Sequence, residues 1–348
     1  YFFFFLYRSI PLNFGSILGN LTSNKLYYSF DFWFFFDLIS FQKNEEEIYF
    51  ISDKSNSLEL NTSLMSFIPT SKTNTSFIGN NVNIQNSMSF VQRNESELNG
   101  LNSLSPFNIP YINASEKGSS FGTLYNMEKG KIAFGTFDGR STDFELETNG
   151  SFIEYSQNLN NSNISFFTGF TNEKNGFLET SVNGAFSEST KADTNFLGAS
   201  TYGWLTKNWS YNGLATLGNT KVEIQGLGFL QRIDDLSSSS FAFELSRSLG
   251  FNEKDNFTFG ISQPLRIEKG KADLLIPQLY NEIGNLEYNN ATVDLNPSGR
   301  QIDLNFGYSA KVDKNKDFGL FFTVSKDYGH VKSQELTNSM FANFKVIF

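Results

Sequence analysis

The sequence predicts an all-β protein, a transmembrane antiparallel β-barrel, and three observations carry that prediction. From about residue 119 onward, segments of roughly 8–12 residues alternate apolar and polar side chains, a period that is typical of strands. These segments approach the length of about 9–11 residues that a tilted membrane-spanning strand needs, whereas ordinary strands average about 5–6. Aromatic side chains gather near the segment ends, where they would meet the membrane interface: Tyr202, Trp204, Trp209, Tyr211, Tyr308, Phe318 and Phe348.

Composition points away from catalysis and toward a structural or binding role. The chain of 348 residues is long enough for one large domain or two ordinary ones. It contains no cysteine and a single histidine, His330, which excludes disulfides, thiolate metal sites and multi-histidine sites, so no metal and no cofactor is expected. Its net charge is 27 − 36 = −9, and an acidic chain is a poor binder of phosphate, so nucleic acid is not an expected partner.

A transmembrane helix is not expected, because no apolar run reaches the 18 or more residues that such a helix requires. The longest candidates are Tyr1–Tyr7 and Phe30–Phe41, and Asp31 and Asp37 interrupt the second. No signal peptide is visible, and Tyr1 is not an initiator methionine. We therefore expect the chain to be the carboxyl-terminal piece of something longer.

The first 75 residues lack a clean alternation and contain the acidic run Glu45–Glu47. We expect residues 1–75 to be an irregular linker or remnant outside the barrel wall, and residues 76–348 to form the barrel. Residues 69–118 are rich in Asn, Ser and Thr and predict loops, short strands or both. A segment from residues 60–120 is a candidate to fill the lumen.

The carboxyl-terminal third contains the clearest strands. In Gln301–Ala310, the side chains of Ile302, Leu304, Phe306 and Tyr308 share one face, opposite Gln301, Asp303, Asn305 and Gly307. The same alternation is found in Ser240–Ser248, Asn256–Ser262, Asp317–Lys326 and Met340–Phe348. Short polar turns at residues 252–255 and 313–316 separate neighbouring strands.

Two architectures share this pattern. In a soluble β-sandwich the apolar faces pack on each other, whereas in an outer-membrane barrel they face lipid and the polar faces line a wet lumen. Ser, Asn, Glu, Gln, Arg and Gly on the polar face favour the barrel. The end of the chain favours it as well, because Phe344, Val346 and Phe348 lie on one face of an alternating strand with a terminal phenylalanine, which resembles the terminal recognition strand of bacterial outer-membrane barrels.

Residues Lys191–Phe348 resemble the autotransporter β-domain attached to subtilisin-like (S8-type) serine proteases of Gram-negative bacteria. The matching segments are Ala192–Leu197 (ADTNFL), Ser238–Ser248 (SSSFAFELSRS), Ile261–Gly270 (ISQPLRIEKG), Leu295–Leu304 (LNPSGRQIDL) and Asp327–His330 (DYGH). The departures are Gln301, where the family usually has an acidic residue, and Tyr328, where it has proline. The resemblance is fainter through Gly122–Phe186.

This resemblance implies a translocator barrel of about 12 strands that anchors and exports a protease passenger by type V secretion. Its partners would be outer-membrane lipid and lipopolysaccharide, the barrel-assembly machinery, periplasmic chaperones and its own passenger. The catalytic motifs of the protease are not found in this sequence, so the chain itself is expected not to be an enzyme. The alternatives are a stand-alone barrel acting as a pore or adhesin, and a soluble extracellular β-sandwich that binds a ligand.

Candidate functional residues are therefore structural ones. Pro297, Ser298, Gly299 and Arg300 predict a tight turn that enters a strand, with Arg300 in the lumen or at its rim. Pro264 and Arg266 belong to the SQPLR segment, where Arg266 and Glu268 share the polar face and predict a paired charge network. His330 with Ser298 and Asn296 could imitate a hydrolase triad, but a structural role is the better interpretation. Asp234, Asp235 and Glu45–Glu47 are interpreted as solvated loop charge rather than as cation sites.

Overall fold

The computed structural model describes most of the chain from residue 58 onward and two short strands before it. The described residues are 27–33, 47–52, 58–80, 107, 109–112, 117–140, 146–178, 180–182, 185–187, 189–226, 228–248, 255–280, 286–313, 316–332 and 335–347. Phe348 and the start of the acidic run, Glu45 and Glu46, lie outside them. Within this part of the chain, no helix is long and apolar enough to cross a membrane.

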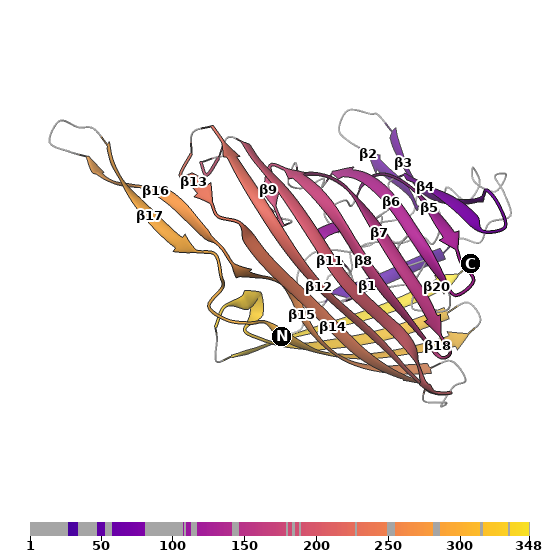
Figure 1. Ribbon diagram of the computed structural model, residues 1–348. Coiled ribbons are helices and arrows are strands. Elements are labelled where there is room, and N and C mark those ends of the chain that lie inside the picture. The colour runs from indigo at the N-terminus through magenta and orange to yellow at the C-terminus, as the bar shows by residue number, and fades with distance from the viewer. Residues whose placement is uncertain are drawn as a thin grey trace.

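One antiparallel sheet of 15 strands dominates the fold and curls around its own inner face (Figure 1). Its strands are β1 (Tyr27–Trp33), β2 (Glu47–Ser52), β3 (Leu58–Pro69), β4 (Asn74–Asn80), β5 (Lys117–Asn126), β6 (Gly130–Arg140), β7 (Glu147–Leu159), β8 (Ser162–Lys174), β11 (Ser189–Thr206), β12 (Trp209–Gln225), β14 (Leu236–Ser248), β15 (Asp255–Lys269), β18 (Ile302–Asp313), β19 (Lys316–Lys326) and β20 (Leu336–Ile347). The sheet order is β1-β20-β19-β18-β15-β14-β12-β11-β8-β7-β6-β5-β4-β3-β2. All five strands predicted in the carboxyl-terminal third are confirmed.

The connections between wall strands differ at the two ends of the sheet. At one end they are short, as between β7 and β8 or between β11 and β12, where two residues join the strands. At the other end, which we call the rim, they are long and contain the remaining elements. These are β9 (Gly176–Phe177), β10 (Thr180–Ser181), β13 (Leu230–Ile233), β16 (Lys271–Tyr280), β17 (Leu286–Asp294) and the short 3₁₀ turns η1 (Pro110–Ile112) and η2 (Tyr328–His330). The β16–β17 hairpin projects beyond the sheet at the rim (Figure 1).

The two faces of the sheet are the reverse of those of a soluble protein. The outer face exposes large apolar side chains: Phe121, Phe166, Leu197 and Leu217 are each exposed by more than half. The inner face buries polar ones, such as Thr148, Glu154, Ser165, Thr194 and Thr216. A soluble sandwich would bury the apolar face, because that burial drives folding in water. In lipid the arrangement is favourable as it stands, since the apolar face meets hydrocarbon and the backbone groups pair within the sheet.

An apolar cluster also occupies part of the inner face. Phe77, Phe137, Phe152, Phe167 and Phe196 come from wall strands, and Tyr111 and Ile112 come from the 3₁₀ turn η1 (Pro110–Ile112) in the connection between β4 and β5. All seven side chains are buried. A segment from residues 60–120 therefore does pack inside the sheet, as the sequence predicts.

The amino-terminal part contributes more to the sheet than predicted. β1, β2 and β3 all come from residues 1–75, and β1 pairs with the last strand, β20. The sequence predicts that residues 1–75 lie outside the wall. That prediction is wrong for these three strands, because β1 pairs with β20 and β3 pairs with β4 in the main sheet. Twelve of the 15 strands of the main sheet come from residues 74–347. The division into a linker of residues 1–75 and a barrel of residues 76–348 stays a prediction.

The two edges of the sheet are strands that follow each other in the chain. β1 is one edge and β2 is the other, and within the described residues no ladder joins them. Because every ladder in this sheet of 15 strands is antiparallel, the two edge strands run in the same direction.

Candidate functional site at the rim

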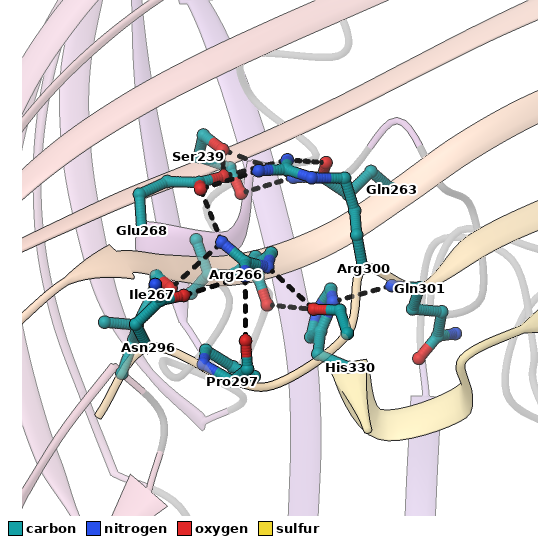
Figure 2. Close-up of polar contacts among 12 residues, drawn as sticks. Ser239, Gln263, Arg266, Ile267, Glu268, Asn296, Pro297, Arg300, Gln301 and His330 are labelled. Atoms are coloured by element: carbon teal, nitrogen blue, oxygen red, sulfur yellow. Dashed lines mark hydrogen bonds and ion pairs between the residues drawn. The ribbon is translucent and has the colours of Figure 1, made fainter. Parts of the chain in front are cut away.

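Three segments that lie far apart in the sequence meet at the rim in one polar network (Figure 2). They are the end of β15 with Gln263, Arg266 and Glu268, the connection 295–301 that enters β18, and the connection 327–332 that follows β19. Because β15 pairs with β18 and β18 pairs with β19, the ends of these three strands lie side by side. Three of the segments that carry the family resemblance thus form one structural unit.

A β-bulge in β15 turns the side chains of Gln263 and Arg266 to the same face of the strand. The ladder with β14 shifts register between Ser239 and Phe241, opposite the stretch from Gln263 to Arg266. In an unbroken strand, residues three apart would point to opposite faces. Here Gln263 and Arg266 are both buried, at 2% and 8% exposure. Pro264 lies within the bulge, where a residue without an N–H group leaves no ladder bond unmade.

Arg266 lies at the centre of the network and joins the end of β15 to the connection 295–301. Its Nε donates to the Gly299 carbonyl oxygen at 3.0 Å, and its Nη2 donates to Asn296 Oδ1 at 2.7 Å and to the Pro297 carbonyl oxygen at 2.9 Å. Its Nη1 pairs with the carboxylate of Glu268. The planar guanidinium can satisfy this set because it presents five donors in a fixed geometry.

Glu268 joins Arg266 to Arg300. Arg300 Nη2 lies 2.7 Å from Glu268 Oε2, and Arg300 Nη1 lies 2.9 Å from Glu268 Oε1. The Ser239 hydroxyl donates to the same carboxylate at 2.6 Å. The shared polar face therefore pairs Arg266 with Glu268 as predicted, and it places Arg300 at the rim. The Arg300 side chain is 47% exposed, whereas that of Arg266 is 9% exposed, so the inner arginine carries the greater cost of being left unpaired.

His330 closes the network from the third segment. Its Nδ1 accepts the backbone N–H of Gln301 at 3.0 Å, and its Nε2 lies 2.9 Å from the Leu265 carbonyl oxygen. One nitrogen must accept and the other must donate, so the contacts select the neutral ring protonated at Nε2. Its own carbonyl oxygen accepts the Gly299 N–H at 2.7 Å.

The two departures from the family pattern are accommodated in this geometry. Gln301 Oε1 accepts the Gly329 N–H at 2.8 Å, and its Nε2 donates to both carboxylate oxygens of Asp303 at 2.9 and 3.0 Å. An amide can accept and donate at once, whereas a carboxylate in this place would face Asp303 with a like charge. Tyr328, which stands where the family usually has proline, is 63% exposed, so its larger side chain does not have to fit into the interior.

Gly299 is the one residue of the turn that no other type can replace without a shift of the backbone. A Cβ atom added there would lie 2.6 Å from the Lys332 nitrogen. Ser298 beside it accepts the Lys332 N–H through its hydroxyl at 3.1 Å. The turn Pro297–Arg300 therefore packs backbone to backbone against the connection 327–332.

The arrangement holds connections together and is not a triad. Both ring nitrogens of His330 bind backbone groups, Asn296 binds Arg266, and Ser298 binds Lys332. A hydrolase needs the base within reach of the nucleophile and the third group on the base. We therefore interpret this unit, with Arg266 at its centre, as a structural clasp and call it the rim clasp.

The rim clasp is expected to weaken in acid through His330. Burial lowers the pKa of His330 below its ordinary value, the charges of Arg266 and Arg300 lower it further, and the Leu265 carbonyl and Asp303 oppose these effects. The folded state thus binds the proton more weakly than the unfolded chain, so the stabilising contribution is complete above about pH 6.5 and declines below it. Urea unfolding of the chain in vesicles at pH 7.5 and pH 5.5 checks this.

The variant His330→Gln separates this effect from general acid denaturation. Glutamine offers a donor and an acceptor but does not titrate. Its stability should change less between the two pH values than that of the parent chain. An equal change in both proteins would contradict a role for His330.

The remaining candidate residues are not members of the rim clasp. Phe344 and Val346 belong to β20, whose ladder to β19 pairs Phe318 with Phe344; their side chains and all of Phe348 lie outside the described residues. Asp234 and Asp235 line a rim cavity of about 230 Å³ with Glu268, Lys271 and Asp294. Arg232 pairs with Asp234 at 3.6 Å and Lys271 with Asp294 at 3.9 Å, so basic groups accompany the acidic ones.

The sequence alone did not identify Ser239, Gln263 and Asn296 as members of the clasp. The inward position of Gln263 could have been inferred from Pro264 beside it, because a proline inside an alternating strand indicates a bulge. Asn296 precedes the Pro297 turn and contributes through its side-chain oxygen. Ser239 gave no signal, since it is one of four consecutive serines.

Comparison with known proteins supports the fold and leaves the family open. No protein-family model and no curated protein sequence matches the chain. Among solved structures, OmpTΔL8, a loop deletion mutant of the outer membrane protein OmpT of Vibrio cholerae, superposes with a TM-score of 0.50 at 8% identity, covering 93% of this chain and 97% of that one. OmpT itself gives 0.49 at 8% identity over 93% and 96%, and a porin gives 0.46 at 9% identity over 93% and 99%.

The fold is therefore that of an outer-membrane β-barrel. The superposition spans nearly the whole chain, although the two sequences have little in common. The apolar outer face and the polar inner face agree with it, because only a sheet that satisfies its own backbone groups can expose such a face to lipid. Fold and surface together place the chain in the bacterial outer membrane.

Proposed function

We propose that the chain is the translocator barrel of an autotransporter of a Gram-negative bacterium, which anchors and exports a subtilisin-like serine protease passenger. The observation that supports this most is the rim clasp. Its three segments each resemble the β-domain of that family, and their side chains bind one another. A chance match of short motifs would give no reason for Glu268 to pair with both Arg266 and Arg300, or for His330 to bind the backbone of Leu265 and Gln301.

One further feature agrees with this proposal. In bacterial barrels the short turns face the periplasm and the long connections face outward, so the rim clasp would lie at the cell surface. The barrel would reach the membrane through the assembly machinery and periplasmic chaperones, and its outer face would contact lipid and lipopolysaccharide. Protease activity would belong to the passenger and not to this chain.

Export of a reporter tests the proposal. An epitope-tagged, disulfide-free domain is joined ahead of residue 1, and the whole chain is produced in a Gram-negative host. We expect protease added to intact cells to remove the tag. Heat-modifiable gel mobility reports separately whether the barrel has assembled. A correctly assembled barrel whose reporter remains protected inside the cell would overturn the translocator proposal while leaving the fold intact.

A stand-alone pore is the second candidate, and one observation favours it. The inner segment Ile109–Ile112 belongs to a connection between two wall strands, so the lumen can be occupied without any upstream passenger. A pore of this kind would conduct ions in a planar bilayer with no fusion partner attached. The adhesin alternative would instead depend on the long connections at the rim.

A further inference from the structure

A row of phenylalanine and glycine residues crosses the inner face. The strand ladders pair Phe77 with Gly122, Gly122 with Gly135, Gly135 with Phe152, Phe152 with Gly169, Gly169 with Phe196, and Phe196 with Gly218. Each phenylalanine ring lies over a neighbouring glycine. A Cβ added at Gly169 would lie 2.5 Å from the Phe196 ring, and one added at Gly135 would lie 2.6 Å from the Phe152 ring.

Tyr111 continues this row although it does not belong to the wall. Its ring covers Gly218, where an added Cβ would lie 2.5 Å from Tyr111 Cε1. The ring also stacks on Phe196 with centroids 5.3 Å apart and planes inclined by 13°. Gly218 pairs with Ser238 on the next strand, and the Tyr111 hydroxyl reaches that residue, 3.3 Å from its carbonyl oxygen and 3.1 Å from its hydroxyl oxygen.

Gly218, Phe196 and Ser238 thus form a socket that fits a tyrosine side chain. Glycine provides the floor, because any side chain there would occupy the space of the ring. Phe196 provides a stacking face, and Ser238 provides partners for the hydroxyl, without which burying that hydroxyl would be costly. Tyr111 is 4% exposed, and its neighbour Ile112 is fully buried.

The wall around the socket is polar. Thr194 binds Thr220 through their hydroxyl oxygens at 2.8 Å, and Thr216 binds Ser240 at 2.6 Å. All four side chains belong to strands β11, β12 and β14, which carry the socket. If the segment left, these hydroxyl groups would line a hydrated path rather than a dry cavity, since polar walls hold water.

We propose that Tyr111 is the latch of a gate: seated in the socket of Phe196, Gly218 and Ser238, it holds the segment Ile109–Ile112 across the inner face and closes the lumen. Ile109 and Ile112 of the segment are buried beside the latch in the same apolar cluster, and no disulfide fixes the segment. Release of the ring from the socket opens the path. The proposal rests on the barrel fold and applies equally to a translocator and to a stand-alone pore.

Conductance of latch variants in planar bilayers tests the gate. Tyr111→Ala removes the ring, and Gly218→Ala places a methyl group where the ring lies. Both variants should conduct several-fold more than the parent chain, and Tyr111→Phe, which keeps the stacking and loses the hydroxyl bonds, should fall between. The matched control is Gly198→Ala, whose added Cβ would lie 2.3 Å from the wall residue Phe167 and not from the segment. It should conduct like the parent.

Cysteine labelling reports the position of the segment directly. The chain has no cysteine of its own, so Ile112→Cys introduces a single thiol. A membrane-impermeant maleimide should label it slowly in the parent background and several-fold faster when Gly218→Ala is added. Unchanged conductance and unchanged labelling in a heat-modifiable Tyr111→Ala protein would overturn the gate, even if Gly218→Ala failed to fold. Reporter export is measured separately, so this failure differs from failure of the translocator proposal.

Discussion

Replacing Arg266 by alanine is expected to destabilise the folded chain by about 3–5 kcal/mol, the cost of breaking a buried ion pair by removing one partner. The side chain is 9% exposed, so water cannot replace the lost contacts. The carbonyl oxygens of Gly299 and Pro297 would lose their guanidinium donor. The connection 295–301 would then be held by its bonds to His330 and Lys332 and by the pairing of Arg300 with Glu268.

The midpoint of urea unfolding in vesicles measures this effect. Arg140→Ala is the matched control, because Arg140 also pairs with a glutamate at 3.1 Å but is 75% exposed. That exposed pair is worth about 0–1 kcal/mol, so its loss should barely move the midpoint. Arg266→Lys should behave more like alanine than like arginine, since an ammonium group cannot make the same fork of bonds. Equal effects of Arg266→Ala and Arg140→Ala would show that the rim clasp does not stabilise the fold.

Strands and their faces could be predicted from the sequence because a period of two is a local property. Phe241 and Phe243 are exposed while Ala242 between them is buried, as the alternation requires. The alternation does not by itself decide between lipid and a second sheet. That choice needed the polar character of the inner face, seen in Thr194, Thr216 and Thr220, and the length of the strands.

The rim clasp could be predicted only in part. Arg266 and Glu268 are two residues apart on one strand, so their common face is evident from the sequence. The contact of Arg266 with Gly299 depends on the register of β15 against β18, which the separate motifs do not specify. The inward turn of Gln263 depends on the bulge beside Pro264. Both are properties of strand pairing rather than of local pattern.

Two features had no usable signal in the sequence. β1 to β3 come from a stretch without clean alternation, so their place in the sheet follows from pairing with β20 and β4 and not from composition. The seating of Tyr111 depends on Gly218, which is 107 residues further along the chain. Each phenylalanine of the inner row looks, in the sequence, like any other apolar residue of a strand. The glycine that lies opposite each phenylalanine can be identified only once the pairing register of the strands is known.

Introducing proline at Ala342 is expected to abolish assembly of the barrel. Ala342 lies in β20 between two neighbours, opposite Leu320 of β19 and Phe32 of β1. Proline lacks the N–H group and its ring obstructs the ladder, so backbone groups on β20 and on one neighbour lose their partners. In hydrocarbon no water can replace them, at several kcal/mol for each group. The folded fraction, measured by heat-modifiable gel mobility of the membrane fraction, should fall sharply while total synthesis stays the same.

Asn338→Pro provides the matched control on the same strand. Asn338 is four residues nearer the rim, points the same way as Ala342, and pairs with Val324 alone within the described residues. Its side chain and those of its neighbours from Leu336 to Met340 are exposed. Water at the rim can hydrogen-bond the groups that proline frees there, so this variant should assemble in amounts close to those of the parent. If both prolines prevented assembly equally, the effect would come from breaking β20 at any position. It would not depend on how deep the position lies in the membrane. Only a difference between them supports the conclusion that β20 crosses lipid at Ala342 and leaves it before Asn338.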